Sequence, residues 1–315
     1  MSTRHDVCQP YMDYVQEILD DGTLTGDRTG TGTRSLFGDR LKFDVATKAP
    51  FLTQRKLPLR SVIGELLWFI EGSVDVDVLK NDYKCNFWDE WASIKTRTIG
   101  PMYGMQWRDA NGVDQLANLL KKAVSNPTSR RLIVDSWVPE LIPDEETDPT
   151  LNPEAGIMAL APCHFAYQLK LYQISHTSPS YIVHLAYAQR SLDFFLGAPN
   201  NIASYYILLR LICGYLHRVT GHPHIPCNLI AHMGDTHIYN NHIDAANELL
   251  NRSESPEVPQ FIIDDEAIDI FESYIDGSFY KEGDLPAARL RNLKALHSKI
   301  VNYHPQAPIQ GARNV

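Results

Sequence analysis

The sequence lacks the features that mark disulfide-stabilised and metal-dependent proteins. It has five cysteines, an odd number, and no two of them form a Cys-x-x-Cys pair. This pattern indicates a reducing compartment rather than a disulfide framework. Neither a His-Glu-x-x-His motif nor zinc-type Cys/His spacing accompanies the 12 histidines. We therefore expect no metal site.

Long uncharged apolar runs are also missing. Residues 1–10 are polar and contain no apolar core of a signal peptide. The most apolar stretch, residues 202–219, includes Arg210, His217 and Arg218, which favours a buried helix over a membrane span. The sequence therefore predicts no membrane association and a cytoplasmic location, or the cytoplasm of a host cell if the protein is viral.

An excess of positive charge is absent too, since the formal net charge is −9. Proteins that bind nucleic acid polymers through their phosphates usually carry a basic face. In this acidic chain an anion site must be a local cluster of arginines. That condition favours a small anionic substrate over a nucleic acid polymer.

The apolar residues, 44% of the chain, follow both helical and strand-like periods. No repeat or linker divides the sequence, so we predict one domain over residues 1–315. The mixture predicts an α+β fold with a sheet covered by helices on one side. Helices are expected at 11–19, 58–72, 113–124, 201–219, 236–250 and 287–301. Strands are expected at 35–43, 131–137, 158–161, 165–172 and 181–187. Residues 88–108 are expected to form short loops with a helical turn, and residues 139–156 an exposed acidic loop.

Cys163 is the candidate nucleophile. It follows Pro162 between two predicted strands, at a bend that can hold the sulfur towards a cavity. Free cysteines are more often buried and inert, so a core position is the alternative. A reactive thiolate needs positive neighbours. Four arginines occupy polar, turn-like or strand-end positions: Arg28, Arg130, Arg131 and Arg190.

Arg130 and Arg131 are adjacent, and on a strand their side chains would point to opposite faces. One of them could then serve its own site and the other the site of a neighbouring subunit. A pair of solvated surface charges is the alternative.

Residues 189–203 carry polar groups suited to a nucleotide. Arg190 and Ser191 offer hydrogen-bond donors for phosphate oxygens, and Asp193 can order nearby backbone. Asn201 opens a predicted helix, where it can act as the cap. Its amide also presents a donor and an acceptor together, which matches the O4 and N3–H edge of uracil.

Two further positions are candidates because of their spacing. His237 and Tyr239 are two residues apart, so in an extended segment both can face one ligand. Glu65 lies within the apolar stripe of the predicted helix at 58–72, an unusual place for a carboxylate.

Together these segments resemble the thymidylate synthase family over nearly the whole chain. Eight motifs occur in the order found in that family, and a set of this size is specific although each motif alone is weak. They are DRTGTGT at 27–33, LRSVIGELLWFIEG at 59–72, FWDEWA at 87–92, GPMYGMQWR at 100–108, SRRLIV at 129–134, MALAPCH at 158–164, QRSLDFFLGAPNNIASY at 189–205 and GDTHIYNNH at 234–242.

The resemblance implies an α+β fold with a large mixed sheet that packs across a homodimer interface. It implies C5 methylation of dUMP with 5,10-methylenetetrahydrofolate as co-substrate, through addition of Cys163 to C6 of the ring. The implied catalytic residues are Cys163, Glu65, Tyr103 and Asn201, with Asn201 reading the base. The implied nucleotide-binding residues are Arg28, Arg190 and Ser191 for the phosphate, Arg130 and Arg131 from the partner subunit, and His237 and Tyr239 for the ribose. The implied folate-binding residues are Trp88, Trp91, Asp193, Gly197 and Val315.

Several positions depart from the family's usual pattern: Arg55, Pro58, Ala188, Leu192, Asn200 and the polar tail at 311–315, together with apparent insertions near 141–156 and 280–300. These departures leave the candidate nucleophile Cys163 in place, but they allow a different last step of the reaction. In that alternative, water captures the intermediate, and the product is a 5-hydroxymethyl nucleotide made from dUMP or, with lower preference, from dCMP or CMP. Asn201 favours uracil, and the retained Trp88 and Trp91 favour methylation. A third alternative, a protein that only binds nucleotide or RNA, would need a lost nucleophile.

Overall fold

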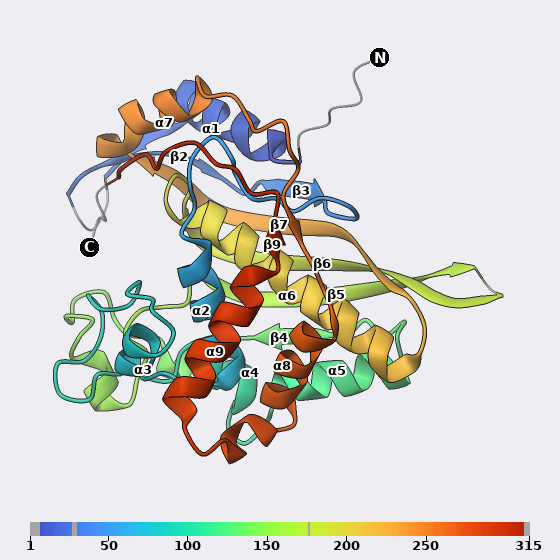
Figure 1. Ribbon diagram of the computed structural model, residues 1–315. Coiled ribbons are helices and arrows are strands. Elements are labelled where there is room, and N and C mark those ends of the chain that lie inside the picture. Colours follow the sequence, from blue (N-terminus) through green and yellow to red (C-terminus); the bar gives the residue numbers. More distant parts are fainter. Residues whose placement is uncertain (1–6, 27–29, 176, 312–315) are drawn as a thin grey trace.

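The computed structural model describes residues 7–26, 30–175 and 177–311 (Figure 1). Within these residues a seven-stranded mixed sheet has the order β1-β2-β7-β6-β5-β4, and β3 also pairs with β7. The neighbouring strands run antiparallel except for β6 and β7, which are parallel. The strands are β1 (Thr23–Thr25), β2 (Thr33–Phe37), β3 (Arg40–Asp44), β4 (Ile133–Asp135), β5 (His164–Ser175), β6 (Ser178–Asp193) and β7 (His224–Tyr239).

Helix α6 (Gly197–Thr220) makes the crossover that the parallel pair requires. It packs against both β6 and β7. On β6 the residues at positions 183, 185, 187 and 189 are buried, whereas those between them are partly exposed. Because side chains alternate along a strand, helices cover one face of the sheet and leave the other face more open. The fold class predicted from the sequence is confirmed.

The other helices begin and end at recognisable residues. The side chains of Asp75, Asp114, Asp264 and Asp284 accept backbone N–H groups at the start of four of them. The α-helices are α1 (Gln9–Asp21), α2 (Leu59–Glu71), α3 (Val76–Asn81), α4 (Gly104–Arg108), α5 (Gln115–Ser125), α7 (Ile243–Leu250), α8 (Asp265–Ile275) and α9 (Leu285–Ser298). The short elements are η1 (Pro139–Leu141), η2 (Asn152–Ala155), η3 (Asn240–His242), η4 (Ser278–Lys281), β8 (Gln260–Phe261) and β9 (Ile300–Val301). In the described ranges, no helix is long and apolar enough to cross a membrane.

The predicted helices at 11–19, 58–72, 113–124, 201–219 and 287–301 are confirmed within a few residues. One other prediction is wrong, and two are wrong in part. Residues 158–161 form no strand. Residues 236–239 are the end of β7, paired with β2 and β6, and helix begins only at Ile243. The strand expected at 35–43 is interrupted by a turn at Gly38, whose φ of 91° suits glycine.

A buried charged cluster fixes helix α2 against helix α9. The Arg289 guanidinium donates hydrogen bonds to Glu71 at the end of α2 and to Asp82 after α3. The Tyr83 hydroxyl also donates to the Glu71 carboxylate, at 2.7 Å. A paired buried charge is costly to break, because removal of one partner leaves the other unpaired. Helix α2, which carries Glu65, is therefore held rigidly from the side of α9.

Candidate active site

Cys163 lies immediately before β5 and keeps some exposed surface. Arg190 of the neighbouring strand β6 holds this turn. Its backbone N–H donates to the Cys163 carbonyl at 2.8 Å, and its Nε and Nη2 donate to the carbonyls of Pro162 and Ala161 at 3.1 and 2.8 Å. On the other side of Arg190, a Cβ on Gly234 would lie 2.6 Å from the Arg190 carbonyl oxygen, so only glycine fits there.

The charge balance at the thiol differs from the sequence-based expectation. Burial raises the pKa of the Cys163 thiol above its ordinary value, and the nearby positive charge of Arg190 only opposes this effect. Arg190 lowers the pKa of the thiol, as expected, but desolvation of the thiolate raises it by more.

Tyr103 contacts the candidate nucleophile Cys163 directly and has a strained backbone. Its hydroxyl oxygen accepts the backbone N–H of Cys163 at 2.9 Å. Its φ is 31°, which is unfavourable for a residue other than glycine. A Cβ on the following Gly104 would lie 2.9 Å from the Phe69 Cα, so α4 packs closely on α2 at this point. Strained backbone at a functional group is typical of active sites, where the surrounding packing maintains it.

Glu65 is connected to the same group through Trp88. The Trp88 Nε1–H donates to Glu65 Oε1 at 2.7 Å. The Trp88 ring lies 5.7 Å from that of Trp91 and 5.5 Å from that of Tyr103. Burial raises the pKa of Glu65 to about 7, and the Trp88 hydrogen bond opposes this shift. The structure therefore joins Glu65, Trp88, Tyr103 and Cys163 by contacts, with a carboxyl that titrates near neutral pH.

A second group lies at the carboxyl ends of the parallel strands β6 and β7. Ser191 is opposite Asp235, and Asp193 is opposite His237. The His237 Nδ1 and Asp235 Oδ1 are 2.6 Å apart. The rings of His237 and Tyr239 are 5.1 Å apart, on the same strand. The carboxyl ends of adjacent parallel strands are a common place for a ligand site.

Asp193 orders the start of helix α6. Its Oδ1 accepts the backbone N–H groups of Phe195 and Leu196 at 3.0 and 2.9 Å. Gly197 begins the helix, and a Cβ there would lie 3.7 Å from the Asp193 Cβ. Asp193 thus orders backbone, as the sequence predicted.

Asn201 does not cap helix α6. The helix begins at Gly197, four residues earlier, so the capping alternative is wrong. Asn201 is partly exposed, and its side-chain amide makes no hydrogen bond with another described residue. The amide is thus available to a ligand. The adjacent Asn200 is different, because its Nδ2 donates to the Leu196 carbonyl at 3.2 Å.

The structure does not bring Arg130 and Arg131 to Cys163 within this chain. Arg130 and Arg131 are exposed and precede β4 instead of lying on it, so the argument from opposite strand faces fails. Arg28 and Val315 lie outside the described residues.

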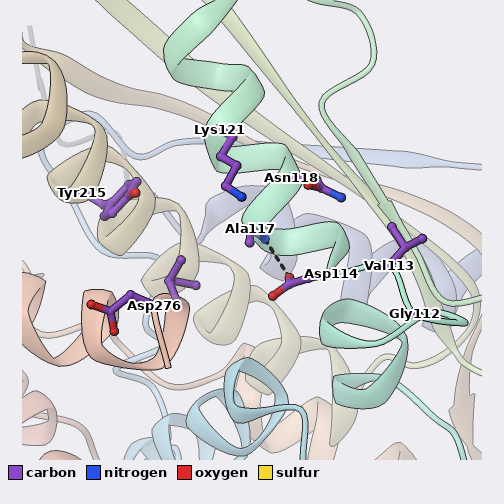
Figure 2. A pocket seen from close by; sticks show the side chains of 9 residues that line it. Gly112, Val113, Asp114, Ala117, Asn118, Lys121, Tyr215 and Asp276 are labelled. Carbon is purple, nitrogen blue, oxygen red and sulfur yellow. Dashed lines mark hydrogen bonds between the residues drawn. The ribbon is translucent and has the colours of Figure 1, made fainter. Parts of the chain in front are cut away.

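A pocket of about 570 Å³ lies elsewhere, between α5, α6 and the end of α8. Figure 2 shows Asp114, Lys121, Tyr215 and Asp276 around it. None of the predicted site residues lines this pocket. As for metals, no group of three or more potential ligands was found among residues 7–26, 30–175 and 177–311.

Sequence reasoning missed two residues, His164 and Tyr205. The His164 ring stacks on the Tyr103 ring at 4.3 Å, and its Nδ1 lies 2.9 Å from the Tyr205 hydroxyl. Burial lowers the pKa of His164 to about 3. The only sequence signal was a histidine directly after the candidate nucleophile.

Comparison with known proteins decides the family. The family model described as thymidylate synthase matches residues 9–312. The chain belongs to the thymidylate synthase family. A thymidylate synthase from Francisella philomiragia is 40% identical over 292 residues, which cover 92% of this chain and 98% of that protein. One from Francisella tularensis subsp. holarctica is 38% identical over 284 residues, covering 89% and 98%. Membership in this family makes the protein a one-carbon transferase, as the sequence resemblance implied.

Proposed function

We propose that the protein methylates C5 of dUMP, with 5,10-methylenetetrahydrofolate as the donor of both the one-carbon unit and the hydride. The observation that carries the proposal is the setting of Cys163. It is partly exposed, its backbone N–H is bound by the strained Tyr103, and the Arg190 side chain braces the preceding turn. Such a setting suits a fixed nucleophile better than a core cysteine.

In this reaction the Cys163 thiolate adds to C6 of the pyrimidine, and an electron pair moves onto C5 and O4. C5 then bonds to the one-carbon unit of the folate, whose C–N bond breaks. Loss of the C5 proton and release of the folate amine leave an exocyclic methylene on the ring. Hydride transfer from tetrahydrofolate gives the methyl group and dihydrofolate, and elimination restores the Cys163 thiolate.

Two side chains near the nucleophile suit the proton transfers. The Glu65 carboxyl, with a pKa of about 7, can both hold and release a proton near neutral pH. Tyr103 is the candidate for receiving the C5 proton through water. Burial raises the pKa of Tyr103 well above its ordinary value, so its hydroxyl stays neutral and would act by orienting the water that takes the C5 proton.

The remaining residues are assigned to binding the nucleotide and the folate. Asn201 reads the base with its unpaired amide. The other assignments are Arg28, Arg190 and Ser191 for the phosphate, His237 and Tyr239 for the ribose, and Trp88, Trp91, Asp193, Gly197 and Val315 for the folate.

The proposal includes a homodimer formed through the open face of the sheet. Ile133, Tyr172 and Ile174 are 46%, 53% and 51% exposed there, and large exposed apolar side chains favour burial against a second copy. Arg130 and Arg131, which are exposed beside β4, would then reach the partner's phosphate site. The single domain, the insertions near 141–156 and 280–300 and the cytoplasmic location stay predictions from the sequence.

The alternative product is a 5-hydroxymethyl nucleotide, formed when water instead of hydride captures the exocyclic methylene. The observation that favours it is the polar Asn200 next to Asn201. The Asn200 Oδ1 is buried and has no hydrogen-bond partner among the described residues, so it offers an acceptor for water.

Product analysis tests the proposal. The protein is incubated with methylenetetrahydrofolate and dUMP, dCMP or CMP, and the nucleotides are analysed by mass spectrometry. We expect dTMP from dUMP, with dihydrofolate formed in equal amount. A hydroxymethyl product together with tetrahydrofolate would establish the alternative, and no product from any nucleotide would contradict both.

Asn201→Asp is expected to shift preference from uracil to cytosine nucleotides. The carboxyl can pair with the N3/N4 edge of cytosine, whereas uracil loses the amide donor for O4. Loss of a matched hydrogen-bond donor at a specific site changes kcat/KM by about 10² or more. The measurement is the ratio of kcat/KM for dUMP and dCMP. If Asn201→Asp keeps the parent's ratio while Asn200→Asp changes it, Asn201 does not read the base.

A further inference from the structure

Tyr205 of helix α6 is buried, and its hydroxyl is directed to the histidine that follows the nucleophile. The Tyr205 Oη and the His164 Nδ1 are 2.9 Å apart, and the two rings are perpendicular at 5.5 Å. One face of the His164 ring stacks on Tyr103 at 4.3 Å. Tyr103 and Tyr205 therefore fix the His164 ring from two sides, and Tyr103 also binds the Cys163 backbone.

The direction of the hydrogen bond follows from the surroundings of Tyr205. The Tyr205 hydroxyl makes no hydrogen bond to any described residue other than His164. If Nδ1 carried the proton, the Tyr205 O–H would be buried without an acceptor, at a cost of about 1–3 kcal/mol. If Tyr205 donates to Nδ1, both groups are satisfied and the His164 proton lies on Nε2.

We propose that Tyr205 is a positioning residue that holds His164 as the neutral Nε2–H tautomer, with this N–H available in the active site. Burial keeps both groups in the required forms, because it raises the pKa of Tyr205 and lowers that of His164. The inference rests on the proposed function for its purpose. When Cys163 adds to C6, negative charge develops on the pyrimidine carbonyl oxygen, and a fixed neutral N–H donor stabilises such charge.

The chain offers a matched control in Tyr187. This buried tyrosine on β6 stacks on Tyr205, with ring centroids 4.3 Å apart and an interplanar angle of 11°. Its hydroxyl has no hydrogen-bond partner in the part of the chain that the structure describes. Tyr205→Phe and Tyr187→Phe each remove one buried hydroxyl from the same stack, but only the first removes a hydrogen bond to His164.

The direct test is NMR of ¹⁵N-histidine-labelled protein, with the His164 signals assigned by comparison with His164→Gln. We expect the parent and Tyr187→Phe to show a neutral His164 with the proton on Nε2. Tyr205→Phe should show a mixture of the two tautomers. This measurement needs no substrate, so it remains decisive even if the proposed reaction is wrong. A proton on Nδ1 in the parent, or an unchanged tautomer in Tyr205→Phe, would overturn the proposal.

Steady-state kinetics of the complete reaction, with dUMP and methylenetetrahydrofolate, provide the second measurement. For Tyr205→Phe, kcat should fall by roughly 10- to 100-fold with little change in the KM for dUMP. The ring then loses its fixed orientation as well as its single tautomer, and a misplacement of about 1 Å can cost about 10²-fold. Tyr187→Phe should keep the parent's kcat. Equal losses in both variants would mean that packing in the stack, and not the tautomer, matters, and would also overturn the proposal.

Discussion

Cys163→Ser is expected to lower kcat by at least about 10³-fold while nucleotide binding is kept. A serine hydroxyl is a far weaker nucleophile at neutral pH, and the rest of the site is unchanged by the substitution. The backbone N–H that Tyr103 binds and the carbonyl that Arg190 binds are both retained. Steady-state kinetics measure the loss of turnover, and calorimetry with dUMP measures binding.

Cys227→Ser is the control for this prediction. Cys227 is also partly exposed and lies on strand β7. Its sulfur lies 3.5 Å from the Asn228 Nδ2, near the start of β7, whereas the site residues His237 and Tyr239 lie at the end of that strand. The control should keep the parent's kcat. Turnover of Cys163→Ser within tenfold of the parent would remove Cys163 from the mechanism.

Glu65→Gln is expected to lower kcat by about 10²–10⁴-fold, the usual contribution of a positioned general acid or base. The glutamine keeps the size of the side chain and can accept the Trp88 N–H, but it cannot exchange a proton. The parent's kcat/KM should show an inflection near pH 7 that the variant lacks. Glu140→Gln, at an exposed position in η1, is the control and should match the parent. An inflection that persists in Glu65→Gln would assign it to another group.

The same substitution should change the pH dependence of stability. Because burial raises the pKa of Glu65 from 4.5 to about 7 in the folded protein, the folded state binds this proton more tightly than the unfolded state. Its contribution to the free energy of unfolding is complete below about pH 4.5 and is lost as pH rises through 7. The loss is on the order of 3 kcal/mol. Urea unfolding at pH 5 and pH 8 should therefore show a smaller difference for Glu65→Gln than for the parent. Equal differences would contradict the raised pKa.

The sequence by itself determined the family and most of the helices, and it supplied the candidate nucleophile. Helix periodicity is local, so the apolar stripe at 58–72 was enough to place helix α2. The order of the eight motifs identified the family without any knowledge of contacts. The unusual carboxylate in that stripe, Glu65, was also visible.

Only the tertiary structure decided the secondary structure of residues 236–239 and the protonation states in the site. Residues 236–239 were predicted to be helical, but pairing with β2 and β6 makes them strand, and such long-range pairing leaves no local signal. The raised pKa of Glu65 comes from burial by segments distant in sequence. The hydrogen bond between Tyr205 and His164 joins residues 41 positions apart. Sequence shows which groups are present, but burial and partners exist only after distant segments pack together, and these set the protonation states of Glu65 and His164.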